Sequence, residues 1–368
     1  MRFNPAIEKI VPYSPGTSIE HVMRRYGLES VVKLASNEMP LPPFPEVKAA
    51  IVAALDGLNR YPDGDAVDLR EALATRYQRP VEEVAVGNGS CELLMLLGEA
   101  LLERGDEVVF ADPSFVVYGD VCRLREASAV AVPVLPDFGH DLAAMAAAVS
   151  PRTKMIIVCN PNNPTGNYLP ASEIAAFVDA VPEDVLVVLD EAYNECVTAP
   201  DSQGTLRLQA GRPNVCILRT FSKVYGLAGL RIGYGLCPEP LKSALDKVRQ
   251  PFNTSRLAQV AAVEALKHDE RVLERRRSNA DLRDYMTGEL AATGRATVPT
   301  EANFMLVDIN DLCPPQEQVC DALMQLGAIV RDGNKLGCPG WARVTIGTRE
   351  EIDFFLERLA SLGRPAAR

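Results

Sequence analysis

The segment RTFSKVYGLAGLRIGY, residues 219–234, places a lysine in an apolar, glycine-rich stretch that directly follows the apolar run VCIL. A surface lysine normally lies among other polar residues. Shielding by Phe221 and Tyr225 would strip water from the amine of Lys223, which lowers its pKa and makes it a nucleophile for carbonyl carbon. The alternative is a lysine whose stem covers apolar surface while its charge stays in water. The rest of the sequence is needed to choose between these two interpretations of Lys223.

Short apolar runs alternate with helical stretches on both sides of this segment, between about residue 65 and residue 250. Four runs end in polar residues: DEVVFADPSF at 106–115, KMIIVCNPNNPTG at 154–166, DVLVVLDEAY at 184–193 and VCILRTFSK at 215–223. Runs that are apolar on both faces are typical of strands covered by helices on both sides, and strand–helix alternation predicts a mostly parallel α/β sheet. Ligands bind beyond the carboxyl ends of such strands, so the polar residues there form the candidate site.

The chain changes character near residue 250. A charged helical region over about 256–293 is followed by short apolar runs and a helix near 315–326, a pattern typical of a smaller α+β domain. We therefore predict three parts: an N-terminal arm with a piece of the small domain over 1–50, a large domain over 51–255 and the small C-terminal domain over 256–368.

The composition argues against several classes of protein. The chain has 368 residues, 47% of them hydrophobic, and a net charge of −11, so the basic footprint of a nucleic-acid-binding protein is missing. Nine cysteines without a CxxC pair, together with only three histidines, argue against a metal site. No window reaches the ~18 apolar residues of a membrane span, and the N-terminal sequence lacks the apolar core of a signal peptide. We expect reduced thiols and a cytoplasmic location.

Two turns rich in glycine or proline follow predicted strands. NPNNPTG, residues 160–166, is a rigid loop that would present Asn163, although an Asn/Pro loop can also be only a turn. GNGSCE, residues 87–92, opens a helix, where glycines let the backbone approach a ligand and free N–H groups point at an anion. This second motif matches neither a Walker loop nor GxGxxG, and a plain turn with a helix cap explains it without any ligand.

A carboxylate stands where the apolar run VLVVL ends. Asp190 is costly at such a position unless it meets a cation or several hydrogen bonds, which makes it a candidate partner for a positively charged group. An aspartate between a strand and a helix is also a good N-cap, and this is the alternative interpretation of Asp190 taken alone.

Together these segments supply the groups that pyridoxal 5′-phosphate needs. Its phosphate requires a helix N-terminus and a cation, its protonated ring nitrogen a carboxylate, its ring hydroxylate neutral donors and its aldehyde an amine. The residues predicted for these roles are Ser90, Cys91, Glu92, Ser222 and Arg231 for the phosphate, Asp190 for the ring nitrogen, Asn163 and Tyr193 for the hydroxylate, and Lys223 for the aldehyde.

With this set of motifs the chain resembles the fold-type I aminotransferases, and within them the histidinol-phosphate aminotransferases. The resemblance runs over almost the whole length through PYSPG (12–16), KLASNE (33–38), NRYPDG (59–64), GNGSCELL (87–94), NPNNPTG (160–166), DEAYNE (190–195), RTFSKVYGLAGLRIGY (219–234), VRQPFNTS (248–255), EANF (301–304), VRDGNK (330–335) and RVTIGTREE (343–351). It implies a mostly parallel seven-stranded sheet flanked by helices in a large domain that binds pyridoxal 5′-phosphate, beside a smaller α+β domain.

The resemblance implies roles for residues around the cofactor. Lys223 would bind the aldehyde and move a proton between substrate and cofactor, with Asp190 and Tyr193 as its catalytic partners. Phe115 would stack on the cofactor ring, where relatives often have tyrosine. Tyr61 would reach the cofactor phosphate of the neighbouring subunit, which implies a homodimer with shared active sites.

Four further residues are implied as substrate ligands. Arg343 would bind the substrate carboxylate, because a guanidinium pairs with it through two parallel hydrogen bonds, and Arg331 would add a cation for a substrate phosphate. Tyr13 in the N-terminal arm would close over the substrate, and Asn37 of KLASNE completes the predicted set.

One departure from the family pattern lies near the substrate entrance. Relatives commonly read NENPLGP, whereas this chain has NEMPLPP at 37–43. The leading hypothesis is amino transfer between histidinol phosphate and 2-oxoglutarate, giving imidazole acetol phosphate and glutamate. The motifs leave open an aromatic amino-acid aminotransferase, a threonine-phosphate decarboxylase and a non-catalytic regulator that binds the same cofactor.

Overall fold

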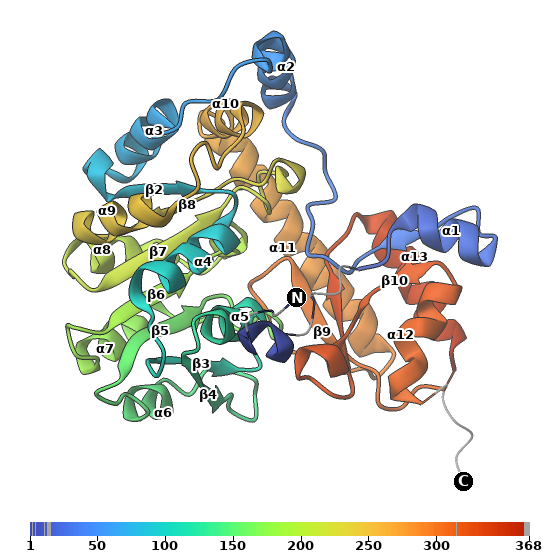
Figure 1. The fold of residues 1–368 in the computed structure, drawn as a ribbon. Coiled ribbons are helices and arrows are strands. Elements are labelled where there is room, and N and C mark those ends of the chain that lie inside the picture. Colours follow the sequence, from blue (N-terminus) through green and yellow to red (C-terminus); the bar gives the residue numbers. More distant parts are fainter. Residues whose placement is uncertain (2, 4, 11, 13–15, 314, 364–368) are drawn as a thin grey trace.

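A seven-stranded sheet forms the core of the larger part of the molecule in the computed structural model, which describes residues 1, 3, 5–10, 12, 16–313 and 315–363 (Figure 1). The strand order is β2-β8-β7-β6-β5-β3-β4. β8 runs antiparallel to both of its neighbours, and the other strand pairs are parallel. The strands are β2 (Val84–Gly87), β3 (Glu107–Asp112), β4 (Ser128–Pro133), β5 (Thr153–Cys159), β6 (Leu186–Asp190), β7 (Val215–Thr220) and β8 (Gly233–Leu236). The predicted mostly parallel sheet is confirmed.

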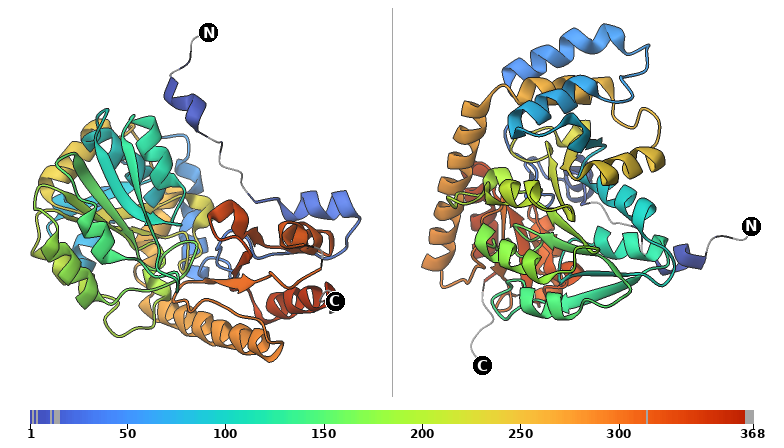
Figure 2. Two further views of the ribbon diagram at one scale, coloured as in Figure 1. Left: turned by 90° about the horizontal axis from the view of Figure 1, so that it is seen from below. Right: turned by 90° about the vertical axis from the view of Figure 1, so that its left-hand side faces the viewer.

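Alternate residues of each central strand enter two different cores, as the two-residue period of a strand requires. In β6, Val187 and Leu189 join one core, whereas Leu186 and Val188 join the other. Helices cover both faces of the sheet (Figure 2). The first core includes residues of α2 (Pro45–Ala54), α3 (Val67–Tyr77), α6 (Leu142–Ala147), α7 (Ala171–Ala180) and α10 (Arg256–Ala265); the second includes residues of α4 (Ser90–Leu101), α5 (Val117–Leu124) and α9 (Glu239–Val248). α8 (Gly204–Ala210) packs on α7 and β7.

A smaller unit stands beside the large sheet and has its own core. It contains an antiparallel sheet of order β11-β12-β9 and a short parallel pair of β1 with β10. Its elements are α1 (Ile19–Tyr26), β1 (Val32–Lys33), β9 (Phe304–Asp308), α12 (Gln316–Gln325), β10 (Ala328–Ile329), β11 (Arg331–Asp332), β12 (Trp341–Thr345) and α13 (Arg349–Ser361). Since β1 pairs with β10, the segment after the N-terminal arm is part of this unit.

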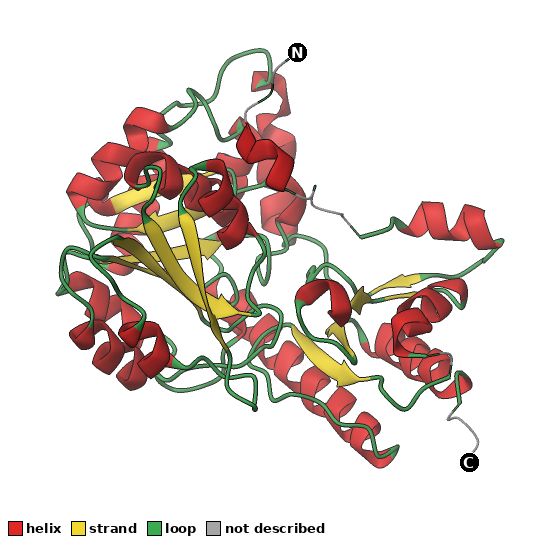
Figure 3. Ribbon diagram, turned by 60° about the horizontal axis from the view of Figure 1, so that its bottom comes forward, coloured by secondary structure: helices red, strands yellow, loops and turns green. Residues whose placement is uncertain are grey.

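One long helix, α11 (Asp269–Ala292), connects the two parts (Figure 3). Val272 near its start packs in the core beneath the large sheet, whereas Met286 and Leu290 near its end pack in the core of the small unit. α10, which the sequence analysis assigned to the small domain, contributes Ala258 and Ala262 to the large core. The domain boundaries at residues 50 and 255 stay a prediction.

A buried ion pair lies beneath the carboxyl ends of β6 and β7. The Nη2 of Arg219 lies 2.7 Å from the Oε2 of Glu191, and the two side chains are only 2% and 1% exposed. The remaining hydrogen-bonding capacity is also used: Arg219 donates to Gln203, and Thr205 donates to the other carboxylate oxygen of Glu191. Because Glu191 follows Asp190 directly, this pair fixes the backbone at the position where the candidate site begins.

Breaking this pair tests how far it holds the sheet together. Arg219→Met leaves the Glu191 carboxylate buried without its cation, so we expect the free energy of unfolding to fall by about 3–5 kcal/mol in urea denaturation. Arg212→Met, which breaks a surface pair with Asp179, serves as the matched control and should cost no more than about 1 kcal/mol. Equal losses in the two variants would contradict a structural role for the buried pair.

Candidate active site

A cavity of about 560 Å³ opens at the carboxyl ends of β5, β6 and β7, between the large sheet and the small unit. It is the place that a parallel sheet provides for a ligand. The predicted site residues that line it are Asn37, Ser90, Cys91, Phe115, Asn163, Asp190, Tyr193, Ser222, Lys223, Arg231, Arg331 and Arg343. Segments that are far apart in the sequence therefore meet here, although the individual roles of these residues stay predictions.

The amine of Lys223 lies inside this cavity. Its Nζ donates to the backbone carbonyl of Asn37 at 3.0 Å and lies 5.2 Å from the ring centroid of Tyr193. Burial, followed by the positive charge of Arg343, lowers the pKa of the Lys223 amine to about 8. An amine with this pKa is largely neutral in mildly alkaline solution and can then bond to an aldehyde carbon.

The carboxylate of Asp190 is buried at the end of β6 with one oxygen bonded and one without a protein partner. The hydroxyl of Tyr118 donates to Oδ2 at 2.8 Å, whereas Oδ1 has no hydrogen-bond partner. Burial raises the pKa of Asp190 to about 6, against which the Tyr118 hydrogen bond acts. A buried carboxylate oxygen without a donor needs a cationic or N–H group from a ligand.

The residues predicted for the phosphate site lie around the start of α4. Gly89 precedes this helix with a φ of 83°, a conformation that favours glycine, and a side chain there would come within 2.5 Å of the guanidinium of Arg231. The Nη1 of Arg231 donates to the Oγ of Ser222 at 3.2 Å. Free N–H groups of a helix start, a hydroxyl and an arginine thus face one corner of the cavity, a combination that binds phosphate.

Arg343 connects the small unit to the NPNNPTG loop. It donates through Nη1 to the Oδ1 of Asn163 at 2.5 Å and through Nη2 to the carbonyl of Ala35 at 3.0 Å. Asn37 adopts a left-handed backbone, with a φ of 52°, and its Nδ2 donates to the hydroxyl of Tyr193 at 3.0 Å. The N-terminal segment, the loop and the small unit are thereby tied together around Tyr193.

Two arginines occupy opposing positions at the small-unit side of the cavity. Arg331 on β11 pairs in register with Arg343 on β12, so their side chains lie on the same face of this antiparallel ladder. Like charges directly opposite each other destabilise a strand pair, and an anion between them removes that penalty. The pair is therefore a candidate site for an anionic group of the substrate.

Two predicted residues, Glu92 and Tyr61, have other surroundings. The carboxylate of Glu92 accepts hydrogen bonds from the backbone N–H of Asn88 at 2.6 Å and from Asn253 at 2.5 Å, and Glu92 does not line the cavity. Tyr61 is 79% exposed on the surface and stacks on Phe252. Tyr13 lies outside the described residues.

Tyr118 was not predicted from the sequence. Its hydroxyl bonds one carboxylate oxygen of Asp190, and the other oxygen has no protein partner and faces the cavity. Tyr118 lies in α5, which begins at Val117, and Phe115 lies just before that helix. Their rings meet edge to face with centroids 5.8 Å apart. A second aromatic residue so close in the chain to Phe115, the predicted stacking residue, was the signal that could have identified Tyr118.

The side chains present fit pyridoxal 5′-phosphate. The unpartnered Oδ1 of Asp190 suits a protonated ring nitrogen, the corner at Ser222 and Arg231 suits a phosphate, and Lys223 supplies the amine for an aldehyde. Within the described part of the chain there is no group of three or more His, Cys, Asp or Glu that could hold a metal ion. The described helices also include none with the length and apolarity to cross a bilayer.

The chain belongs to the aminotransferase class I and II family, whose model matches residues 29–359. It is 46% identical over 358 residues to a histidinol-phosphate aminotransferase of Moorella thermoacetica, covering 97% of this chain and 92% of that one. It is 45% identical to the histidinol-phosphate aminotransferase of Brevibacillus brevis, covering 95% of each. The crystal structure of the histidinol-phosphate aminotransferase of Sinorhizobium meliloti in complex with pyridoxal 5′-phosphate is also similar, with a TM-score of 0.89, 31% identity and 98% coverage of both chains.

Substitution of Asp190 tests the consequence of its burial. The carboxyl pKa is about 3.9 in an unfolded chain, and burial raises the pKa of folded Asp190 to about 6. The folded state thus binds this proton more tightly, and the resulting stabilisation is complete below about pH 4 and is lost as the pH rises through 6. We expect Asp190→Asn to raise the free energy of unfolding of the cofactor-free protein at pH 8 by roughly 1–3 kcal/mol, with little gain at pH 4.

The same variant should bind pyridoxal 5′-phosphate at least about tenfold more weakly, since the ring nitrogen loses its carboxylate partner. Asp281→Asn, at an exposed position of α11, is the control for a lost charge. Denaturation curves at the two pH values check the first expectation. A stability change of the same size at both would show that burial of the Asp190 charge is not the cause.

Proposed function

We propose that the chain is a pyridoxal 5′-phosphate-dependent aminotransferase that exchanges the amino group between histidinol phosphate and 2-oxoglutarate. The opposed arginines Arg331 and Arg343, at the far side of the cavity that holds the Lys223 amine, are the observation that carries the substrate assignment. They provide two cations beyond those that the cofactor phosphate uses, as a substrate with its own phosphate or carboxylate requires. The identity to histidinol-phosphate aminotransferases over nearly the full length supports the same choice.

Residues of the large-sheet part would hold the cofactor, keep its ring nitrogen protonated and transfer a proton through Lys223. When bound, the cofactor supplies an electron sink for the carbanion that forms at the substrate carbon. Asp190 would keep the ring nitrogen protonated, Asn163 and Tyr193 would donate to the ring oxygen, and Phe115 would cover the ring face; all four line the cavity. Lys223 would bind the aldehyde, and its Nζ would carry the proton, since a pKa near 8 allows this amine both to accept and to return it.

The phosphate of the cofactor is held by Ser90, Cys91, Ser222 and Arg231 at the start of α4. The N–H groups of the first helical turn and the guanidinium share its negative charge. Glu92 contributes its backbone N–H and, through its carboxylate, holds Asn88 of the same turn in place. Asn37 shapes the substrate side by positioning Tyr193, and Tyr13 of the arm is assigned to the substrate.

The chain forms a homodimer in this proposal, and Tyr61 reaches the cofactor phosphate of the other subunit. Val52, Leu55, Leu58 and Tyr61 are exposed along α2 and the following segment, with side chains 44% to 79% exposed. Exposed large apolar side chains that lie this close together in the chain favour a protein interface here. The nine free cysteines, most of them buried, suit a reducing cytoplasm.

Two arginine variants separate the proposed substrate from the aromatic alternative. Arg331→Ala should lower kcat/KM for histidinol phosphate about 10- to 100-fold, because a charge-assisted contact to the phosphate is lost, with little change for phenylalanine. Arg343→Ala should impair 2-oxoglutarate more than cofactor binding. Steady-state kinetics with histidinol phosphate, phenylalanine and tyrosine as amino donors check the first expectation, and kinetics with varied 2-oxoglutarate beside a cofactor titration check the second.

Wild-type protein that turns over phenylalanine efficiently and leaves histidinol phosphate untouched would refute the proposed substrate. The aromatic amino-acid aminotransferase would then be the better assignment.

A further inference from the structure

Tyr61 and Phe252 form an exposed aromatic pair, here called the aromatic platform. Their rings are stacked with centroids 4.6 Å apart and an interplanar angle of 16°, and the side chains are 79% and 45% exposed. The two residues come from separate segments, the RYPDG loop before α3 and the PFNTS segment before α10. Two exposed rings gain little from each other in water, so something else must hold these segments together.

The backbone of Phe252 is strained. Its φ of 57° lies in the left-handed region, which a bulky residue rarely adopts. Such a conformation persists only where the surrounding contacts determine it, and it commonly marks a functional position. The contacts that join the two segments lie beside the platform, at Gly64, Asp65 and Asn253.

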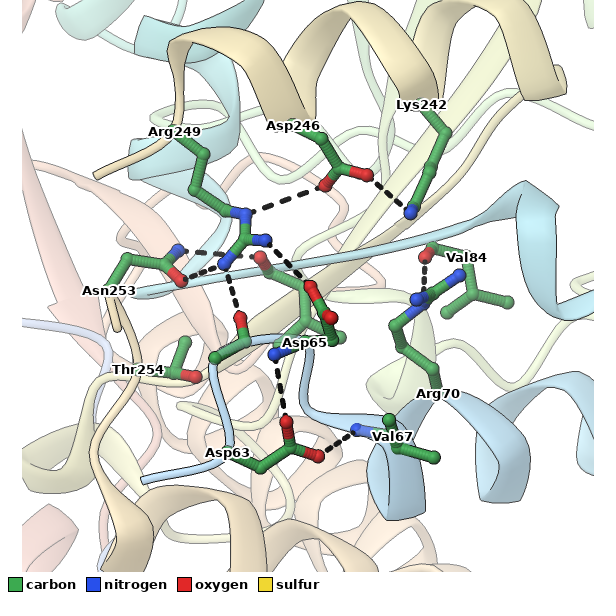
Figure 4. A network of polar contacts seen from close by, with 12 residues as sticks. Asp63, Asp65, Val67, Arg70, Val84, Lys242, Asp246, Arg249, Asn253 and Thr254 are labelled. Carbon is green, nitrogen blue, oxygen red and sulfur yellow. Dashed lines mark hydrogen bonds and ion pairs between the residues drawn. The ribbon is translucent and has the colours of Figure 1, made fainter. Parts of the chain in front are cut away.

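Arg249 makes those contacts (Figure 4). Its Nη1 donates to the carbonyl of Gly64 at 2.5 Å and to the Oδ1 of Asn253 at 3.2 Å, and its Nη2 donates to Asp65 at 3.3 Å. Its Nε lies 3.5 Å from the carboxylate of Asp246. With only 16% of its side chain exposed, this guanidinium joins both platform segments within a few residues of the two rings.

The same network also reaches the phosphate corner of its own subunit. Asn253 donates through Nδ2 to the Oε2 of Glu92 at 2.5 Å, and that oxygen accepts from the N–H of Asn88. Arg249 therefore lies between the aromatic platform and the turn before α4. Its loss can act on the neighbouring subunit through Tyr61 or on its own subunit through Asn253 and Glu92.

We propose that Arg249 is a positioning residue for the cofactor site of the partner subunit, because it fixes the aromatic platform from which Tyr61 extends. This inference rests on the proposed function, in which Tyr61 contacts the cofactor phosphate across a homodimer. An aromatic side chain on an unfixed loop has to be ordered when the cofactor binds, which weakens binding. A loop already fixed by Arg249 avoids that loss, so the contact in the partner is preorganised.

The dissociation constant of pyridoxal 5′-phosphate from the full-length dimer tests whether Arg249 affects cofactor binding. Arg249→Met should raise it about tenfold, the effect of losing one contact to a charged group, and Arg249→Lys should give a smaller rise because one of its contacts can remain. Phe252→Leu, at a half-exposed position with little risk to folding, should weaken binding in the same direction. Arg295→Met is the matched control: Arg295 is also a largely buried arginine bonded to a carbonyl and a carboxylate, but in the small unit.

Mixed dimers separate action on the partner from action within the same subunit. A dimer of one Arg249→Met chain and one Lys223→Ala chain keeps Lys223 only in the Arg249→Met subunit, whose partner has an intact platform. This dimer should bind cofactor covalently in one subunit, there with nearly wild-type affinity, and show about half of the wild-type activity. In a dimer of a wild-type chain with a Lys223→Ala, Arg249→Met chain, the covalently bound cofactor should be held about tenfold more weakly.

Weaker cofactor binding in the first mixed dimer with nearly wild-type affinity in the second would overturn the inference. Arg249 would then act on the cofactor site of its own subunit. Unchanged cofactor affinity in Arg249→Met and Phe252→Leu would overturn it as well. Failure of the proposed dimer has a different signature: Tyr61→Phe would then leave cofactor binding unchanged, or the wild-type protein would be monomeric. Weaker cofactor binding in Tyr61→Phe together with unchanged cofactor binding in Arg249→Met would contradict only the positioning role of Arg249.

Discussion

The arrangement of the site depends on a carboxylate that is kept inside the protein with one oxygen unsatisfied. Asp190 ends β6, and Tyr118 bonds one of its oxygens while the other faces the cavity. Such an arrangement costs stability in the isolated protein, and a bound cation or N–H donor removes that cost. Burial of the Arg219–Glu191 pair next to it keeps the strand ends in place, so the carboxylate cannot turn away to water.

Charged groups from different helices and strands lie in different regions of the cavity. Cationic and N–H groups at the start of α4 and at Arg231 form one positively charged region of the cavity, and Arg331 and Arg343 on the small unit form another. Lys223 and Asp190 lie between these two regions on the ends of β6 and β7. A ligand with a phosphate at one end and a positively charged ring nitrogen therefore matches the large-sheet side, and an anionic substrate matches the small-unit side.

The sequence was sufficient for the sheet and for Asn163, Asp190 and Lys223, because these residues follow apolar runs and parallel strands end at one edge. Arg331 and Arg343 were implied only by the family resemblance. The sequence could not show which oxygen of Asp190 is free, since this depends on Tyr118, which reaches Asp190 from α5. Glu92 was predicted from the helix start alone, where backbone N–H groups and the side chain point in different directions. The Asn37 contact with Tyr193 requires a left-handed backbone, for which an asparagine in sequence gives only a weak signal.

The central claim is that the amine of Lys223, with its pKa lowered by burial, bonds to the aldehyde of the cofactor. Borohydride reduction of the protein loaded with pyridoxal 5′-phosphate, followed by peptide mapping with mass spectrometry, tests it directly. The account predicts that the cofactor mass is found on the peptide that contains Lys223 and is absent from the Lys223→Ala protein. A reduced adduct on any other lysine, with the Lys223 peptide unmodified, would contradict it.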